Sequence, residues 1–374
     1  MYVQRIRTPE GKKRYILLDD DFQIIEVVKD FLKYLDSRRY AENTLKNYCY
    51  HLKLYFEFLQ EHEYNYKDLV EENLEIKVFS EFIEWLNKID NKVIYTQYSE
   101  RPNRRDEATI NAILSAVVTF YDYLYRTGEV RELNIFKDGN INAFKGFLYE
   151  MGTKRNHYKS NIFKLKEKDK LLQVISRDQV NTLIDTCKYI RDKFMIALIF
   201  ESGIRLGEAL GLRKSDIVIW DNKIKIVARE NKENDASVKN KAEGEIIIPG
   251  YICDLYLNYL EKEYIENKEG YIFVNLKGPN KGIAMKAITV QKLFNRLSTI
   301  TGIKVNPHML RHSHATELIE VGGWDCLDVK DRLRHRQIQT TINTYIHLSD
   351  KYKKEKYKEY QENLRKEDSI DTDK

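Results

Sequence analysis

Hydrophobic and polar residues alternate along residues 1–22 of the chain. The segment Thr8-Pro9-Glu10-Gly11-Lys12 interrupts this alternation and contains both proline and glycine. Two alternating runs on either side of such a segment are typical of a β-hairpin, because period two places every second side chain on the same face. We therefore predict a short N-terminal β-hairpin over residues 1–22.

The spacing of hydrophobic residues becomes helical after residue 23. Three stretches place apolar side chains three and four positions apart, as one face of a helix requires. The first helix is predicted to begin at Asn43-Thr44, which can cap it, and the third to end at Gly128. We expect a helical domain over residues 23–150. The predicted buried positions are Leu45, Tyr48, Leu52, Tyr55, Phe56 and Leu59, then Leu74, Val78, Phe82, Trp85 and Leu86, then Ile110, Leu114, Val117, Phe120, Tyr121 and Leu124.

The second half of the chain mixes helical patterns with two short β-patterns. Ser176-Arg177-Asp178-Gln179 fits a capping box, and a helical run that follows it ends at Gly203. Strand-like runs occur at 224–227 and 246–248, and helical patterns resume beyond them. The predicted fold class is mainly α with a small antiparallel β-sheet (α+β). We assign 151–172 to a linker, 173–349 to a second domain and 350–374 to a C-terminal helix or tail.

The composition of the chain indicates how many domains it can form, but it says little about the kind of molecule that the protein binds. A chain of 374 residues, 42% of them hydrophobic, can form more than one core. The net charge of +5 is the small difference between 63 basic and 58 acidic residues, so total charge barely favours nucleic acid. Lysine is concentrated in the linker, and we expect this segment to contact phosphates or to be a solvated connector. Its basic residues are Lys154, Arg155, Lys159, Lys164, Lys166, Lys168 and Lys170.

The cysteines and the absence of long apolar runs exclude several classes of protein. The four cysteines are far apart in the sequence and form no pair at zinc-ligand spacing, so neither a disulfide framework nor a zinc site is predicted. No stretch reaches the roughly 18 uninterrupted apolar residues of a membrane helix, and no signal-peptide core precedes the hairpin. We expect a bacterial cytoplasmic protein without membrane association.

Four segments of the second half carry a cation-rich set of side chains and one nucleophile. The candidate site residues are Arg205, Lys239, His308, Arg311, His335 and Tyr345. Two guanidinium groups can grip the non-bridging oxygens of a phosphodiester and stabilise the charge of its transition state. Histidine and lysine can remove the tyrosine proton and protonate the leaving oxygen. This set of residue types therefore suits attack of a tyrosine on a phosphodiester.

In order and spacing these segments resemble the conserved boxes of the tyrosine recombinase (phage integrase-like) family. Gly203-Ile204-Arg205 followed by Glu208 resembles the G-x-R-x-x-E box, and His308-Met309-Leu310-Arg311-His312 resembles H-x-L-R-H. Leu333-Arg334-His335 precedes the Thr344-Tyr345-Ile346-His347 segment, but Arg334 stands where the family usually has glycine. We expect this arginine to alter the local turn without removing the histidine. Asn43-Thr44, Tyr48 and Leu52 also resemble the family's helical core-binding domain.

The resemblance implies an enzyme that cuts and rejoins double-stranded DNA through a 3′-phosphotyrosine on Tyr345, with no metal and no nucleotide cofactor. The family lysine lies on a hairpin, and here Lys239 fits better than Lys241, and Lys232 less well. Its implied role is to protonate the 5′ leaving oxygen. The resemblance also implies a homotetramer on paired DNA sites, assembled through the C-terminal helix, and leaves room for accessory recombination proteins. The segment Arg229-Glu230-Asn231 and the residues after it favour a mobile-element transposase or integrase.

Several alternatives stay open at this point. The same chemistry would serve a type IB topoisomerase, and the fold would serve a catalytically silent DNA-binding regulator. Glu208 has the spacing of a structural ion-pair partner for Arg205, whereas His312 and His314 are expected to be structural. Tyr345 is one of 26 tyrosines and is selected only by its place after His335. The N-terminal hairpin is either an arm that reads DNA or an edge added to the helical domain.

Overall fold

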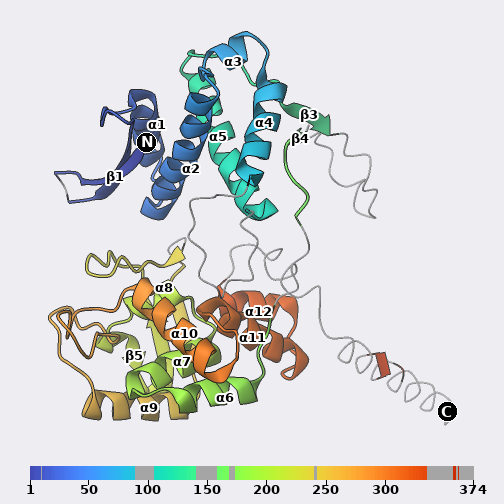
Figure 1. The fold of residues 1–374 in the computed structure, drawn as a ribbon. Coiled ribbons are helices and arrows are strands. Elements are labelled where there is room, and N and C mark those ends of the chain that lie inside the picture. The colour runs from blue at the N-terminus through green and yellow to red at the C-terminus, as the bar shows by residue number, and fades with distance from the viewer. Residues whose placement is uncertain are drawn as a thin grey trace. The chain divides into compact units, whose positions relative to one another are not determined.

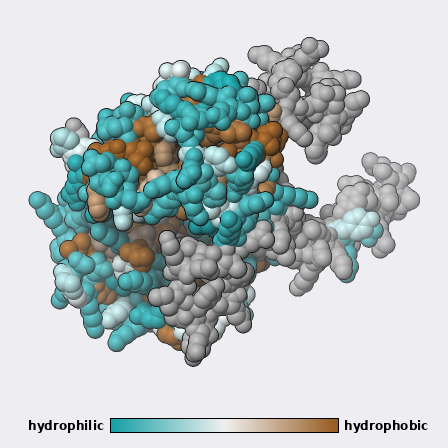
Figure 2. Space-filling model, turned by 45° about the horizontal axis from the view of Figure 1, so that its top comes forward, coloured by the Kyte–Doolittle hydropathy of each residue, from teal (hydrophilic) through white to brown (hydrophobic). Residues whose placement is uncertain are grey.

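The computed structural model describes residues 1–9, 11–88, 105–139, 158–167, 173–239 and 242–334, together with 357, 358 and 361. The chain divides into two compact units, Met1–Asp169 and Lys170–Lys374 (Figure 1). Both are mainly helical with small antiparallel sheets, which confirms the predicted fold class. No helix among the described residues combines the length and apolar character needed to cross a membrane. Figure 2 shows a face on which hydrophilic residues predominate and hydrophobic residues form limited groups.

The first unit begins with the hairpin and continues with helices. Strands β1 and β2 pair antiparallel in the register Tyr2↔Leu18 and Ile6↔Arg14. Helix α2 begins one to two residues before the predicted cap, at an alanine N-cap, Ala41, that makes no side-chain capping bond. Asn43 and Thr44 therefore lie in its first turn. The elements are β1 (Tyr2–Arg7), β2 (Lys13–Leu18), α1 (Glu26–Ser37), α2 (Glu42–Glu61), α3 (Asp68–Glu71), α4 (Glu75–Asn87), α5 (Glu107–Arg126), β3 (Phe136–Gly139) and β4 (Tyr158–Asn161).

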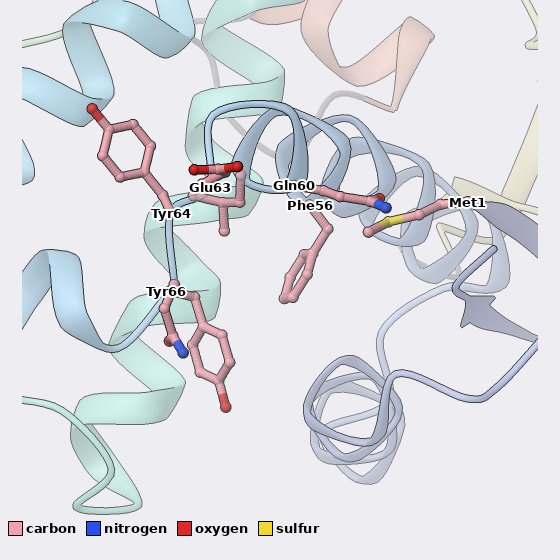
Figure 3. A pocket seen from close by; sticks show the side chains of 8 residues that line it. Met1, Phe56, Gln60, Glu63, Tyr64 and Tyr66 are labelled. Atoms are coloured by element: carbon pink, nitrogen blue, oxygen red, sulfur yellow. The ribbon is translucent and has the colours of Figure 1, made fainter. Parts of the chain in front are cut away.

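The hairpin is attached to helix α2. Leu17 and Leu18 are buried, and Leu17 belongs to the core that the helices form. The Met1 ammonium donates to Asp20 Oδ1 at 2.6 Å, and Gln60 at the end of α2 donates to Asp20 Oδ2 at 3.1 Å. Met1 and Gln60 also line a pocket beside Phe56 (Figure 3). The hairpin therefore packs as an edge of the helical unit.

The chain after α5 returns to the same unit. Strands β3 and β4 pair antiparallel, and Phe163, just beyond β4, stacks on Phe79 of α4 with ring centroids 5.6 Å apart. Asn111 of α5 donates to the carbonyl of Leu165 at 3.0 Å and accepts from its backbone N–H at 2.9 Å. Residues 158–167, which lie within the linker assigned from the sequence, thus pack on the first unit.

The second unit is built around helix α7, whose residues are buried on nearly every face. Helices α6, α9 and α11 all contact it. The predicted capping box at Ser176 is present, and Asn306 caps α11 with Pro307 in its first turn. The elements are α6 (Arg177–Thr186), α7 (Ile190–Ser202), α8 (Leu206–Gly211), β5 (Ile217–Val218), β6 (Lys223–Ile226), β7 (Gly244–Ile247), α9 (Gly250–Lys262), α10 (Ala287–Thr301), α11 (Pro307–Glu320) and α12 (Cys326–Leu333).

The sheet of the second unit has one more strand than the pattern predicted. Its order is β5-β6-β7, and both pairs are antiparallel. Strand β5 contains only two residues, Ile217 and Val218, which is too short to produce a visible alternation of apolar and polar positions. The connection from β6 to β7 is the long loop that carries Lys239.

Candidate active site

A sharp turn between α7 and α8 places Arg205 at the N-terminus of α8. Gly203 ends α7 with φ +64°, and a Cβ atom there would lie 2.7 Å from Cδ2 of His314, so glycine is required both for conformation and for space. Arg205 is the N-cap residue of α8, where its backbone N–H donates to Oε2 of Glu208 at 2.9 Å. Its Nη1 donates to Oε1 of the same carboxylate, also at 2.9 Å.

The Arg205 side chain remains partly accessible to solvent, although the carboxylate of its partner Glu208 is fully buried. The Arg205 side chain is 20% exposed, whereas that of Glu208 is 0% exposed. A buried carboxylate that accepts from both the backbone and the guanidinium of one residue fixes the direction of that guanidinium. Glu208 is thus the ion-pair partner that its spacing suggested, and it orients an arginine that a ligand can reach.

Arg311 joins three segments of the second unit. It lies on α11, is 5% exposed, and donates through Nη1 to the carbonyl of Gly203 and through Nη2 to the carbonyl of Leu333 at 2.6 Å. These carbonyls belong to the α7–α8 turn and to the end of α12. The second arginine therefore holds the turn before Arg205 close to the chain that leads to His335.

His308 is exposed at the start of α11, three residues before Arg311. Partial desolvation by the surrounding protein lowers the pKa of His308 below its usual value, and the positive charges of Arg311, Arg205 and Lys239 lower this pKa further. Charges influence one another in this way only over short distances. The charges of three other predicted site residues therefore act on His308, and the lowered pKa favours its neutral form at pH 7.

Two buried asparagines hold the loop between β6 and β7 against α8. Asn234 donates through Nδ2 to the carbonyl of Leu210 at 2.9 Å and to that of Met285 at 3.1 Å. Asn231 accepts from Nη2 of Arg213 at 3.0 Å. Leu210 lies in the last turn of α8, where a carbonyl has no partner within the helix. The loop therefore supplies the missing donor, and its path is set by side chains rather than by strand pairing.

Further contacts near both ends of this loop fix its path on either side of Lys239. Arg229 forms a two-pronged ion pair with Asp216, with both N–O distances 2.6 Å. Near the other end, a Cβ atom added to Gly207 would lie 2.7 Å from the carbonyl oxygen of Ser237, so the loop touches α8 two residues before Lys239. Lys239 itself is exposed. The sequence indicated the loop and its lysine, but not the anchoring role of the asparagines.

His312 and His314 form no metal site with His308 among the residues that the structure describes. His314 is 5% exposed and packs edge-on against Phe200, and burial together with the nearby Arg332 charge lowers its pKa to about 3. It is a neutral core residue. Burial also lowers the pKa of His312, and His308 and Arg311 contribute to this shift.

Arg334 ends helix α12 in the conformation that glycine adopts most readily. Its φ of 53° and ψ of 48° are left-handed, which is the conformation that a glycine at this position would adopt readily. We expected the arginine to alter the local turn, but its backbone keeps this left-handed conformation. Its Nη2 donates to Oε2 of Glu208, the carboxylate that also holds Arg205. The described residues stop here, and His335, Tyr345 and Lys241 lie outside them, as does the predicted C-terminal helix apart from residues 357, 358 and 361.

Comparison with known proteins finds matches to both units of the chain. The phage integrase N-terminal SAM-like domain matches residues 28–128, and the phage integrase family matches residues 173–352. Transposase A from transposon Tn554 of Staphylococcus aureus (strain N315) is 40% identical over 365 residues, which are 97% of this chain and 98% of that protein. Tyrosine recombinase XerC of Staphylococcus aureus (strain JH9) is 24% identical over 340 residues, which are 89% and 95% of the two chains.

A solved structure shows the same fold at lower identity. The Tn1549 transposon integrase in complex with a circular intermediate DNA superimposes with a TM-score of 0.59 and 15% identity, over 89% of this chain and 99% of that one. The match to Tn554 transposase A spans both units, and the motif residues described above lie inside the matched catalytic region. The chain therefore belongs to the phage integrase, or tyrosine recombinase, family.

Proposed function

We propose that this protein is the site-specific recombinase of a mobile genetic element and that it cuts and rejoins double-stranded DNA through Tyr345. The observation that carries the proposal is the cluster of Arg205, Arg311, His308 and Lys239, which come from three separate segments. Arg311 donates to the carbonyl of Gly203 in the turn before Arg205, and the loop that carries Lys239 touches α8 at Gly207. Full-length similarity to the transposase of Tn554 supports a mobile-element role.

The cluster suits the charge changes of phosphoryl transfer. The phenolic oxygen of Tyr345 would form a bond to phosphorus while the bond from phosphorus to the 5′ oxygen breaks. Neutral His308 can accept the phenolic proton, and Lys239 can give a proton to the departing 5′ oxygen. Arg205 and Arg311 would hold the non-bridging oxygens, and removal of one such donor typically costs about 3–4 kcal/mol of transition-state stabilisation.

Rejoining needs no external energy source in this scheme. The 3′-phosphotyrosine keeps the energy of the broken phosphodiester, so the 5′ hydroxyl of a partner strand can attack it and release Tyr345. His308 and Lys239 then exchange roles, because the reverse step needs a base at the hydroxyl and an acid at the phenol. We propose His335 as an additional partner of the phosphate or of the tyrosine, from its place in the motif.

We propose that the working assembly is a homotetramer on two DNA sites. The support is the family resemblance of the charged segment after Tyr345, whose C-terminal helix would dock on a neighbouring protomer. Accessory recombination proteins would set the direction of the reaction, and the protein would act at the nucleoid. Sedimentation of the protein on one and on two DNA sites tests the assembly directly.

The decisive test of activity uses DNA that carries the ends of the mobile element next to which the gene lies. A nicked suicide substrate should trap a covalent protein–DNA complex without added magnesium, and Tyr345→Phe should form none. A covalent complex with the phenylalanine variant would refute the proposed nucleophile. Relaxation of supercoils without exchange between two sites would favour a type IB topoisomerase, and DNA binding without any cleavage by the wild type would favour a silent regulator.

A further inference from the structure

One carboxylate, that of Glu208, is shared by two arginines from distant parts of the second unit. Arg205 approaches it from the start of α8, and Arg334 approaches it from the end of α12. Glu208 is fully buried, and the Arg334 side chain is only 10% exposed. A single buried anion thus lies between two guanidinium groups, of which Arg205 is the more accessible.

We propose that Arg334 is a positioning residue for DNA cleavage, which acts on Arg205 through Glu208. This inference rests on the function proposed above. With glycine at position 334, Arg205 alone would neutralise Glu208. The Arg205–Glu208 pair would then have no net charge with which to attract a phosphate. When Arg334 shares the carboxylate, the three groups carry a net charge of one positive unit, and Arg205 keeps more of its charge for a phosphate.

The backbone of Arg334 is left-handed, as it is at six other non-glycine residues among those described, and the contact with Glu208 is what distinguishes Arg334. Positive φ is sterically unfavourable for residues other than glycine. Arginine also lacks the short polar side chain that makes this conformation easier for asparagine. Such strain persists only where surrounding contacts hold it in place. Here the contact with Glu208 is a charge-assisted hydrogen bond in a buried setting, which suffices for that purpose.

The neighbouring strand leaves room for this side chain. A Cβ atom added to Gly244, the first residue of β7, would lie 3.2 Å from Cδ of Arg334. Strand β7 follows the loop that carries Lys239, and Arg334 directly precedes His335. Arg334 therefore lies against the strand that follows Lys239 and directly precedes His335, so it adjoins segments of two of the proposed catalytic residues.

The charge balance around Arg334 is also unusual. Its Nε and Nη1 atoms are buried and have no hydrogen-bond partner among the described residues. Burial lowers the pKa of Arg334, and the Arg205 charge lowers it further while Glu208 opposes both effects. A buried ion pair of this kind is weak evidence for a gain in stability, whereas its effect on the charge and orientation of Arg205 follows directly from the shared carboxylate.

The test compares Arg334→Gly with Arg334→Lys in the full-length protein on element-end DNA. Arg334→Gly restores the residue best suited to the left-handed turn, so its melting temperature should stay level or rise. We expect its single-turnover rate of covalent complex formation at saturating DNA to fall by roughly 10- to 100-fold, the range known for residues that orient a functional side chain. DNA affinity should change by less than about threefold. Arg334→Lys keeps the charge and should recover part of the rate.

A matched control separates backbone strain from positioning. Asn222 also has positive φ, 49°, at the surface of the same unit, so Asn222→Gly should leave the cleavage rate unchanged. In an Arg205→Lys background, Arg334→Gly should cause little further loss, because both residues act through one route. The inference would be overturned if the rate reductions of the two single variants multiplied in the double variant. It would also be overturned if Arg334→Gly cleaved at the wild-type rate. If the wild type itself forms no covalent complex, the proposed function fails instead.

Discussion

Replacement of Asn234 by alanine would test whether this asparagine stabilises the second unit and positions the loop that carries Lys239, the proposed catalytic lysine. The change removes the Nδ2 bonds to the carbonyls of Leu210 and Met285 and the bond that Oδ1 accepts from the backbone N–H of Ala236. A buried polar group left without a partner costs about 1–3 kcal/mol, so the two orphaned carbonyls alone correspond to roughly 2–6 kcal/mol. That is a large share of the about 5–15 kcal/mol by which a domain is usually stable.

Urea unfolding would measure this loss in a Trp85→Phe background. Of the three tryptophans, only Trp220 and Trp324 then remain, and both lie in the second unit. Lys232→Ala is the control, because Lys232 is an exposed residue of the same loop and should change stability by less than about 0.5 kcal/mol. Trapping of the covalent complex should be slower with Asn234→Ala than with Lys232→Ala. Equal midpoints for the two variants would refute the anchoring role, and equal trapping rates would refute the link to Lys239.

Three further predictions concern protons. Lys239→Ala should stop cleavage of ordinary DNA, and a 5′-bridging phosphorothiolate, whose sulfur leaves without a proton, should restore it; failure of that rescue would contradict the acid role, and unchanged cleavage of ordinary DNA by Lys239→Ala would point to Lys241. Since the pKa of His308 is lowered, the base is already neutral above pH 6.5, and cleavage should decline only at more acidic pH; a rate that falls already between pH 8 and 7 would contradict this. His314 has a folded pKa of about 3 against 6.5 when unfolded, so only the unfolded state takes up a proton as the pH falls below 6.5. Stability should drop by about 2 kcal/mol between pH 7 and 5, measured by urea unfolding, and His314→Phe should reduce this drop.

Local signals in the sequence were sufficient for most elements of the fold. The Ser176 capping box and Gly203 at the end of α7 act within four residues, so pattern alone identifies them. The start of α2 was misplaced because Asn43 and Thr44 are good caps by type, while the helix begins after Ala41, which forms no side-chain cap. Strand β5 was missed because two residues carry no period.

The candidate site was predictable as a set of residues but not as a network. Arg205 and Arg311 could be chosen from motif and chemistry, because phosphate binding demands guanidinium groups. Their fixed contacts, by contrast, join residues far apart in the sequence, as when Arg334 reaches Glu208 across 126 positions. The same holds for Asn234, whose purpose depends on which carbonyl the end of α8 leaves open.

The close approach of Gly244 to Arg334 couples the residue types that the two positions can accept. Any side chain at position 244 would press on the arginine stem, whereas a glycine at position 334 would free that space. Relatives that keep glycine before the histidine should therefore accept larger residues at the start of β7, and those with arginine should keep glycine there.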